Sequence, residues 1–149
     1  CERLKDLIPR QQFKIPKNVR YITENLYSDK PDGLSGNEDC GQMSSWYIFS
    51  SIGFYPVNPS NGAYVFGSPI FDQVEINLGN GKTMKIIAEN NSDENIYIQK
   101  VTLNGAEYKY SYITHKDLVK GGELKFVMGS TPNLDFGKDP KYRPKSIVY

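Results

Sequence analysis

The stretch QVEINLGNGKTMKIIAE, Gln73–Glu89, has the pattern of a β-hairpin. Apolar and polar side chains alternate on both sides of a central GNGK at 79–82, and a period of two is typical of a strand with one buried face. Glycine and asparagine in so short a link are the residues that reverse a chain. The stretch therefore predicts two strands, 73–78 and 83–89, joined by a tight turn.

The same period recurs over most of the second half of the chain, where turn residues separate short alternating segments. Further strands are predicted at 63–68, 97–104, 108–113 and 123–129. The links NNSDEN (90–95) and NGAE (104–107) have the composition of a loop and of a tight turn. Short strands at this spacing favour an antiparallel β-sandwich.

One segment of this β part, THKDLVKGG at 114–122, predicts a single helical turn instead of a strand. Thr114 is suited to the N-cap, because its hydroxyl can accept a backbone hydrogen bond. Asp117 falls in the first turn, where a negative charge is favourable, and Gly121 is the expected stop.

Two helices are predicted upstream of the β part. The first, 17–28, has apolar residues at helical spacing and Asn18 as its N-cap, with Pro16 as a break before it. The second runs from about 39 to 51 and is apolar on nearly all sides, with Gly53 as the residue expected to stop it. Such a helix is buried in something larger, so either the β part covers it or its partner helices lie outside this sequence.

These patterns together predict an α+β fold, with a short N-terminal helical segment followed by an antiparallel β-sandwich-like domain. The expected division is 1–58 for the helical segment, 59–137 for the β-sandwich domain and 138–149 for an extended tail.

The composition excludes several classes of protein. The 149 residues include 18 Lys and Arg against 17 Asp and Glu, a balance that gives no general attraction to nucleic acid or to an anionic membrane. Two cysteines, Cys1 and Cys40, are too few for a disulfide scaffold, and His115 is the single histidine, which disfavours zinc. No apolar run is long enough to span a membrane.

An acidic motif, GNEDCGQ at 36–42, precedes the second helix. Its adjacent carboxylates, Glu38 and Asp39, have two interpretations. Asp39 fits a helix N-cap, and Ser35 with Glu38 fits a capping box. Alternatively, because like charges repel and a buried carboxylate needs a partner, the pair marks a catalytic or metal-binding corner.

The run GLSGNEDCGQMSSWYIFSSIGFYP, 33–56, and the residues that follow it resemble the C-terminal part of glycoside hydrolase family 92. The likeness continues through YIQKVTLNG, YSYITHKDLVKGGEL and MGSTPNLDFG, and covers about residues 17–137. The family consists of calcium-dependent, exo-acting α-mannosidases, best known for α-1,2 linkages. The resemblance implies that residues 1–58 are the last helices of an (α/α)6 barrel, whose earlier helices would cover the apolar helix.

The resemblance also implies roles for the acidic motif. The family hydrolyses its substrate with inversion of configuration at the anomeric carbon. This reaction needs a general acid and a general base about 6.5–9.5 Å apart, so two neighbouring acids cannot be that pair. Asp39 is the expected base, and Glu38 and Asn37 would orient the water, the sugar hydroxyls or the calcium shell. Gln42 is either a substrate-side hydrogen-bond partner or a buried, satisfied amide. The general acid belongs to the family's upstream barrel and is absent from this chain.

The expected function is therefore the C-terminal portion of an α-mannosidase, with calcium in the intact enzyme and none bound by this fragment alone. Its partners would be a mannose-containing glycan and the upstream barrel, with self-association through the 43–52 helix as an alternative. The competing function is a stand-alone β-sandwich that binds glycan or has only a structural role. Trp46 is expected in the core, Cys40 as a small buried group and His115 at the surface.

The resemblance implies a bacterial protein of the periplasm, the cell surface or the medium, as in Bacteroidetes. A lipoprotein whose signal has been removed would begin at Cys1, and a fragment boundary would explain that residue equally well.

Overall fold

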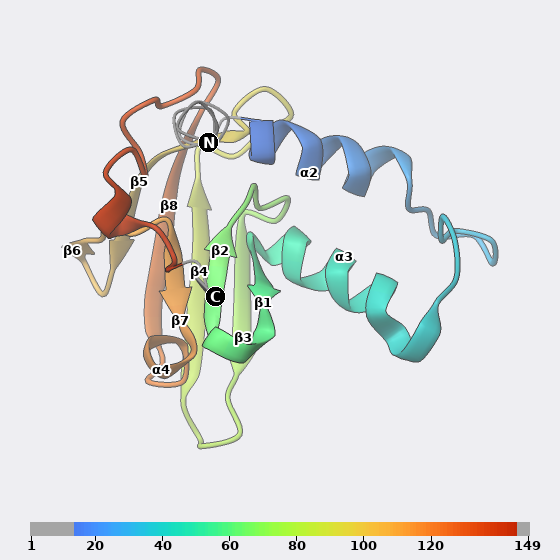
Figure 1. Cartoon of the computed structure of the whole chain (residues 1–149), viewed down its shortest axis with the longest axis horizontal. Helices are drawn as coiled ribbons and strands as arrows, with labels where there is room; N and C mark the ends of the chain where they lie inside the picture. The colour runs from blue at the N-terminus through green and yellow to red at the C-terminus, as the bar shows by residue number, and fades with distance from the viewer. Residues whose placement is uncertain (1–13, 146–149) are drawn as a thin grey trace, which may run out of the picture.

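The computed structural model describes residues 14–145, in which two helices extend to one side of a β-region (Figure 1). The helices are α2 (Lys14–Asn25), α3 (Gln42–Ile52) and the short α4 (His115–Leu118). The strands are β1 (Phe54–Asn58), β2 (Ala63–Phe66), β3 (Gln73–Asn77), β4 (Thr83–Glu89), β5 (Tyr97–Leu103), β6 (Ala106–Glu107), β7 (Tyr112–Thr114) and β8 (Gly122–Gly129). Short 3-10 turns lie at Asp39–Gly41, Pro59–Asn61 and Pro140–Tyr142. Cys1 and residues 146–149 of the predicted tail lie outside the described residues.

Two sheets form the β-region, a 3-stranded sheet in the order β1-β2-β7 and a 5-stranded sheet in the order β3-β4-β8-β5-β6. Their apolar faces pack together, and the ring of Phe66 on β2 meets that of Phe126 on β8 edge-on, with centroids 5.1 Å apart. The core residues with at most 2 % exposure are Phe126, Phe54, Met84, Ile86, Val101, Ile113 and Leu124. The α+β class and the sandwich-like β part are confirmed.

Strand β8 lies between β4 and β5 and differs from the expected pairing. It is antiparallel to β5 but parallel to β4, with partners from Met84↔Gly122 to Glu89↔Val127. The expectation of wholly antiparallel strands is therefore wrong for this pair. A period of two is the same in both kinds of ladder, so the alternation of side chains carries no information on direction.

Both predicted turns are confirmed. The GNGK link joins β3 to β4 as an antiparallel hairpin, in which the Leu78 N–H donates to the Lys82 carbonyl at 2.7 Å. The NGAE turn joins β5 to β6, with Asn104 at φ 53° and Gly105 at φ 80°. Two successive left-handed residues are what a tight hairpin turn of this kind requires, and Asn-Gly adopts them at low cost.

The strand predicted at 108–113 is wrong in extent, because only Tyr112–Thr114 forms a strand there. Between β6 and β7 the chain leaves the 5-stranded sheet for the 3-stranded one. Within this crossing, the Ser111 N–H donates to the Tyr142 carbonyl at 2.8 Å. The same contact shows that the tail is not wholly extended, since Tyr142 belongs to a 3-10 turn against the β-region.

Strand β1 was not predicted, because Pro56 stands in its middle. Proline lacks the N–H that a central strand needs, but it is tolerated at the edge of a sheet. β1 is an edge strand that pairs only with β2, through Phe54↔Phe66 and Tyr55↔Val65. It falls inside the 1–58 segment assigned to helices, although the division into domains itself stays a prediction.

Helix α2 begins at Lys14, earlier than expected, so Asn18 lies inside the helix and is not its N-cap. Pro16, expected as a break, is accommodated in the first turn of α2. The missing proline N–H costs nothing there, because N–H groups of a first turn have no intrahelical acceptor.

The cap of α4 is confirmed. Thr114 Oγ1 accepts from the Asp117 N–H at 3.1 Å and donates to Asp117 Oδ2 at 2.7 Å. The Lys120 ammonium group lies 2.7 Å from Asp117 Oδ1. The hydrogen bond from Lys120, and then that from Thr114, hold the pKa of the Asp117 carboxyl below its ordinary value of 3.8.

This lowered pKa predicts a contribution of Asp117 to stability that depends on pH. Because the folded pKa lies below that of the unfolded chain, the contribution is complete above about pH 4 and is lost as the pH falls through the folded pKa. Asp117→Asn should lower the Tm at pH 6 and leave it closer to wild type at pH 2. Thermal unfolding across this range, with the exposed acid variant Glu94→Gln as control, would test it, and a Tm difference independent of pH would contradict it.

Candidate active-site loop

The acidic loop, defined here as Asn37–Gln42, lies at the start of α3, at the end of that helix that points away from the β-region (Figure 1). Asn37, Glu38, Asp39 and Gln42 are all exposed. Cys40 at φ 55° and Gly41 at φ 75° turn the backbone to the left-handed side, which separates the 3-10 turn of the loop from the helix. The loop therefore presents its polar side chains outward and does not continue the helix.

Glu38, and not Asp39, bonds to the first turn of α3. Both Glu38 carboxylate oxygens accept from the Ser44 N–H, at 3.3 and 3.2 Å. Such a contact satisfies a backbone donor and places a negative charge at the positive end of the helix dipole. The residue at the N-cap position of α3 is Gly41, so the interpretation of Asp39 as N-cap is wrong. No hydrogen bond between Ser35 and Glu38 exists in the described residues, so the capping box is wrong as well.

The carboxylate of Asp39 differs from that of Glu38 in its contacts. It makes no side-chain hydrogen bond or ion pair within residues 14–145, whereas Glu38 is held by the helix. The Glu38 carboxylate is therefore oriented by the helix, whereas the Asp39 carboxylate can bond to another molecule. The alternative of a buried Gln42 and the expectation of a buried Cys40 are wrong, because both residues are exposed. The substrate-side role of Gln42 stays a prediction.

An aromatic cluster of Tyr27, Trp46, Tyr47 and Tyr55 supports the loop from the helix side. Tyr27 stacks on Trp46, with centroids 5.8 Å apart and planes within 13°, and lies 4.8 Å from the Tyr47 ring. Its hydroxyl donates to the Met43 carbonyl at 3.2 Å. Burial, and then the charge of Glu38, raise the pKa of Tyr27. Trp46 also lies 6.5 Å from Tyr55. It is only half-buried and stands outside the buried core, so the core position expected for it is wrong.

A tight turn before the acidic loop depends on Gly33. The Ser28 N–H donates to the Gly33 carbonyl at 3.0 Å, and the Gly33 N–H donates to the Lys30 carbonyl at 2.9 Å. A Cβ at position 33 would lie 2.1 Å from the Ser28 carbonyl oxygen, which no side chain can do. Glycine is the residue whose backbone can approach another backbone this closely.

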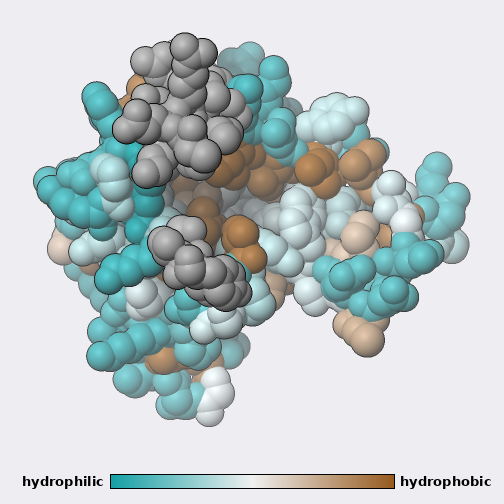
Figure 2. All heavy atoms as spheres, viewed as in Figure 1, coloured by the Kyte–Doolittle hydropathy of each residue, from teal (hydrophilic) through white to brown (hydrophobic). Residues whose placement is uncertain are grey.

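The helices present an open apolar surface. Ile48 on α3 is 56 % exposed, Tyr21 on α2 is 61 % exposed, and Leu26 just beyond α2 is also exposed. Figure 2 shows hydrophobic residues gathered along α2. Of the two alternatives for the apolar helix, complete cover by the β part is wrong, because Ile48 is exposed. His115, expected at the surface, is exposed, and its Nδ1 lies 3.1 Å from the Tyr64 hydroxyl.

The oxygens of the acidic loop are of the type that calcium takes, but they are few. Calcium requires six to eight oxygen ligands, and Asn37 and Glu38 would supply only part of such a shell. Residues 14–145 contain no group of three or more His, Cys, Asp or Glu side chains placed to hold a metal ion. The loop therefore fits calcium as a contributor to a shell completed by other groups. No helix among these residues has the length and hydropathy needed to cross a membrane.

The comparisons place the chain among the glycoside hydrolases. The family model described as glycosyl hydrolase family 92 catalytic domain matches residues 9–130, which include the whole acidic loop. The chain belongs to glycoside hydrolase family 92, as its motifs indicated.

Solved structures and a curated relative agree with this assignment. A family GH92 α-mannosidase from Bacteroides thetaiotaomicron, solved with mannoimidazole, is 42% identical over 89% of this chain, with a TM-score of 0.84. An inverting mannosidase of the family from the same organism is 41% identical over 90% of the chain, with a TM-score of 0.83. An uncharacterized secreted glycosidase from Arthroderma benhamiae is 35% identical over 76% of the chain. The chain spans only 17%, 18% and 15% of these proteins, respectively.

Proposed function

We propose that the chain forms the C-terminal portion of an inverting, calcium-dependent, exo-acting α-mannosidase that removes α-1,2-linked mannose from glycans. The observation that carries the proposal is the 42% identity to an α-mannosidase over 89% of the chain, together with a family match that contains the acidic loop. The identity supports the substrate class, and the open loop supports a role at a surface where another part of the enzyme meets the sugar.

Asp39 is the general base in this proposal. Its carboxylate is exposed and free of hydrogen bonds within the described residues, so it can accept a proton from a water that attacks the anomeric carbon. Glu38 keeps a fixed direction through the Ser44 N–H and orients the water or contributes to a calcium shell. Asn37 and Gln42 flank the two carboxylates with exposed amides that can bond sugar hydroxyls. The general acid must come from outside this chain, about 6.5–9.5 Å from the base.

The remainder of the catalytic domain is the proposed partner of the open helical surface. Exposed side chains such as Ile48 and Tyr21 are larger and more apolar than a helix in water favours, and a neighbouring helix layer would bury them. We also propose that the protein acts in the periplasm, at the cell surface or in the medium. The description of the Arthroderma benhamiae relative as secreted supports an extracytoplasmic site.

The isolated 149-residue chain is expected to release no mannose from α-1,2-mannobiose. Loss of a general acid alone removes about 10²–10⁴ in rate, before the missing sugar contacts are counted. Chromatographic measurement of free mannose would test this, with a complete family α-mannosidase as positive control. The same relative, truncated to remove the region similar to this chain, should regain hydrolysis when this chain is added. Mannose release by the chain alone, or its binding of mannobiose without restoring the truncated relative, would contradict the proposal.

A further inference from the structure

We propose that Arg20 is a positioning residue, which fixes α2 on the β-region and through α2 holds Tyr27 and the acidic loop in place. The part of this inference that concerns catalysis rests on the proposed function. The part that concerns the structure of the loop stands on the contacts of Arg20 and its neighbours alone.

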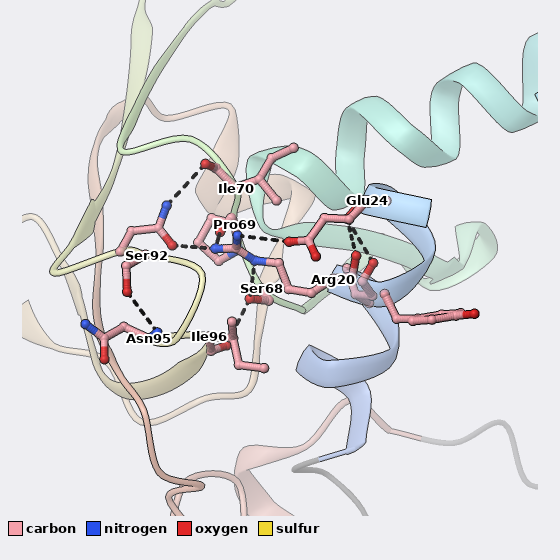
Figure 3. A network of polar contacts seen from close by, with 12 residues as sticks. Arg20, Glu24, Ser68, Pro69, Ile70, Ser92, Asn95 and Ile96 are labelled. Atoms are coloured by element: carbon pink, nitrogen blue, oxygen red, sulfur yellow. Dashed lines mark hydrogen bonds and ion pairs between the residues drawn. The ribbon is translucent and has the colours of Figure 1, made fainter. Parts of the chain in front are cut away.

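The guanidinium group of Arg20 is bonded on several sides (Figure 3). Although it is an arginine, only 6 % of the residue is exposed. Its Nε donates to Ser68 Oγ at 3.1 Å, and its Nη2 donates to the Pro69 carbonyl and to Asn91 Oδ1, each at 2.5 Å. Its Nη1 lies 3.6 Å from Glu24 Oε1, one turn along α2. A planar fork of donors can serve several acceptors at once, which a lysine cannot do.

The acceptors of Arg20 are themselves fixed to the β-region. Ser68 Oγ donates onward to the Ile96 carbonyl at 2.9 Å. Asn91 Nδ2 donates to the Ile70 carbonyl at 3.2 Å and to Asp72 Oδ1 at 3.3 Å. The network thus joins α2 to two loops, the one after β2 and the one between β4 and β5. Both loops connect strands of the sandwich, so the guanidinium group is bonded to rigid parts of the fold.

The hydrogen bonds from Arg20 to Ser68, Pro69 and Asn91 are the only side-chain hydrogen bonds or ion pairs that join α2 to the β-region in residues 14–145. Burial lowers the pKa of Arg20, while the charges of Glu24, Asp93 and Asp72 raise it. A buried cation is stable only when its donors are used, so loss of any acceptor leaves the group in an unfavourable position. Arg20 therefore supplies the polar attachment of α2 to the β-region, beside the apolar contact of Val19 with Gly67.

The acidic loop depends on both helices. α3 is joined directly to the β-region, because Gly53 leads into β1 and the Ile70 N–H donates to the Ser51 carbonyl at 3.0 Å. α2 leads to Tyr27, which stacks on Trp46 and bonds the Met43 carbonyl. A shift of α2 would separate Tyr27 from α3, and the segment between the helices, including Glu38 and Asp39, would lose one of its two supports.

Trp46 is the single tryptophan of the chain and reports on this contact directly. In Arg20→Met, Trp46 emission should shift to longer wavelength and its quenching by acrylamide should rise, under conditions where the protein is still folded by circular dichroism. Asn91→Ala, which removes one acceptor and keeps the arginine, should change both in the same direction and by less. Ile113→Val, a change in the buried β core, is the matched control and should alter neither.

Unchanged emission and quenching in a folded Arg20→Met protein would overturn the proposal. If Arg20→Met does not fold, Asn91→Ala and Ser68→Ala decide the matter by the same measurement. The structural result does not depend on whether the chain contributes to a mannosidase. In an active enzyme that contains this segment, Arg20→Met should lower kcat by about tenfold, as expected for displaced catalytic groups. The assay is made at a temperature below the Tm of the variant. An altered Trp46 signal with unchanged kcat would overturn the link to the acidic loop, while the wild-type assay tests the proposed function separately.

Discussion

Asp39→Asn is expected to lower kcat by about 10² or more in the longer enzyme to which we propose that this chain contributes. The amide keeps the size of the side chain and removes its basicity, so the attacking water would lose its proton acceptor. Stability should barely change, because Asp39 is exposed and makes no side-chain hydrogen bond or ion pair in residues 14–145. Steady-state kinetics on an α-1,2-mannoside and one melting curve measure the two effects.

Asp32→Asn is the matched control, since Asp32 is an exposed acid of the segment that precedes the acidic loop. It should leave both kcat and Tm close to those of the wild type. Azide or another small anion should restore part of the activity of Asp39→Asn, because an anionic nucleophile needs no general base. A kcat within error of wild type for Asp39→Asn would rule out the assignment of the base.

Phe126→Ala is expected to destabilise the fold by about 3–5 kcal/mol. Phe126 is fully buried on β8, pairs with Ala88 and Val101 on the two neighbouring strands, and meets Phe66 of the opposite sheet. Removing its ring leaves a cavity between the two sheets. The sheets cannot approach each other to fill it without breaking other contacts. Since domains are stable by only about 5–15 kcal/mol, the loss should be plain in urea unfolding.

Phe71→Ala makes the same chemical change at a position that is 49 % exposed. It should cost far less, because about half of the residue already contacts water and no closed cavity forms. Equal losses of stability in the two variants would show that the packing between the sheets is not what stabilises the β-region.

Much of the β-region could be predicted from the sequence, because its signals are local. The alternation in 73–89 and the Asn-Gly pair at 104–105 each determine a hairpin without help from distant residues. Strand direction and sheet membership are not local properties. β1 could not be predicted with Pro56 inside it, since only its place at a sheet edge makes the proline acceptable, and that place depends on β2 and β7.

The candidate site was predicted in composition but not in geometry. The sequence singled out Glu38 and Asp39 correctly as neighbours at the start of a helix, but it assigned the helix contact to the wrong one. The left-handed backbone at Cys40 and Gly41 shifts the contact to Glu38, and nothing in the sequence marks Cys40 as left-handed. The Arg20 network was missed because its members, Arg20, Ser68 and Asn91, are far apart in sequence and unremarkable one by one.

The place of β8 has a consequence for how the chain folds during synthesis. Of the strands in residues 14–145, β8 is the last to leave the ribosome, yet it occupies the middle of the 5-stranded sheet, between β4 and β5. Until it has emerged, β4 and β5 have no partner on their inner sides and expose unpaired backbone groups to other nascent chains. The sheet also closes through contacts distant in sequence, which form slowly. A chain interrupted before Gly122 should therefore aggregate or be degraded, whereas loss of the residues after Gly129 leaves every strand of that sheet in place.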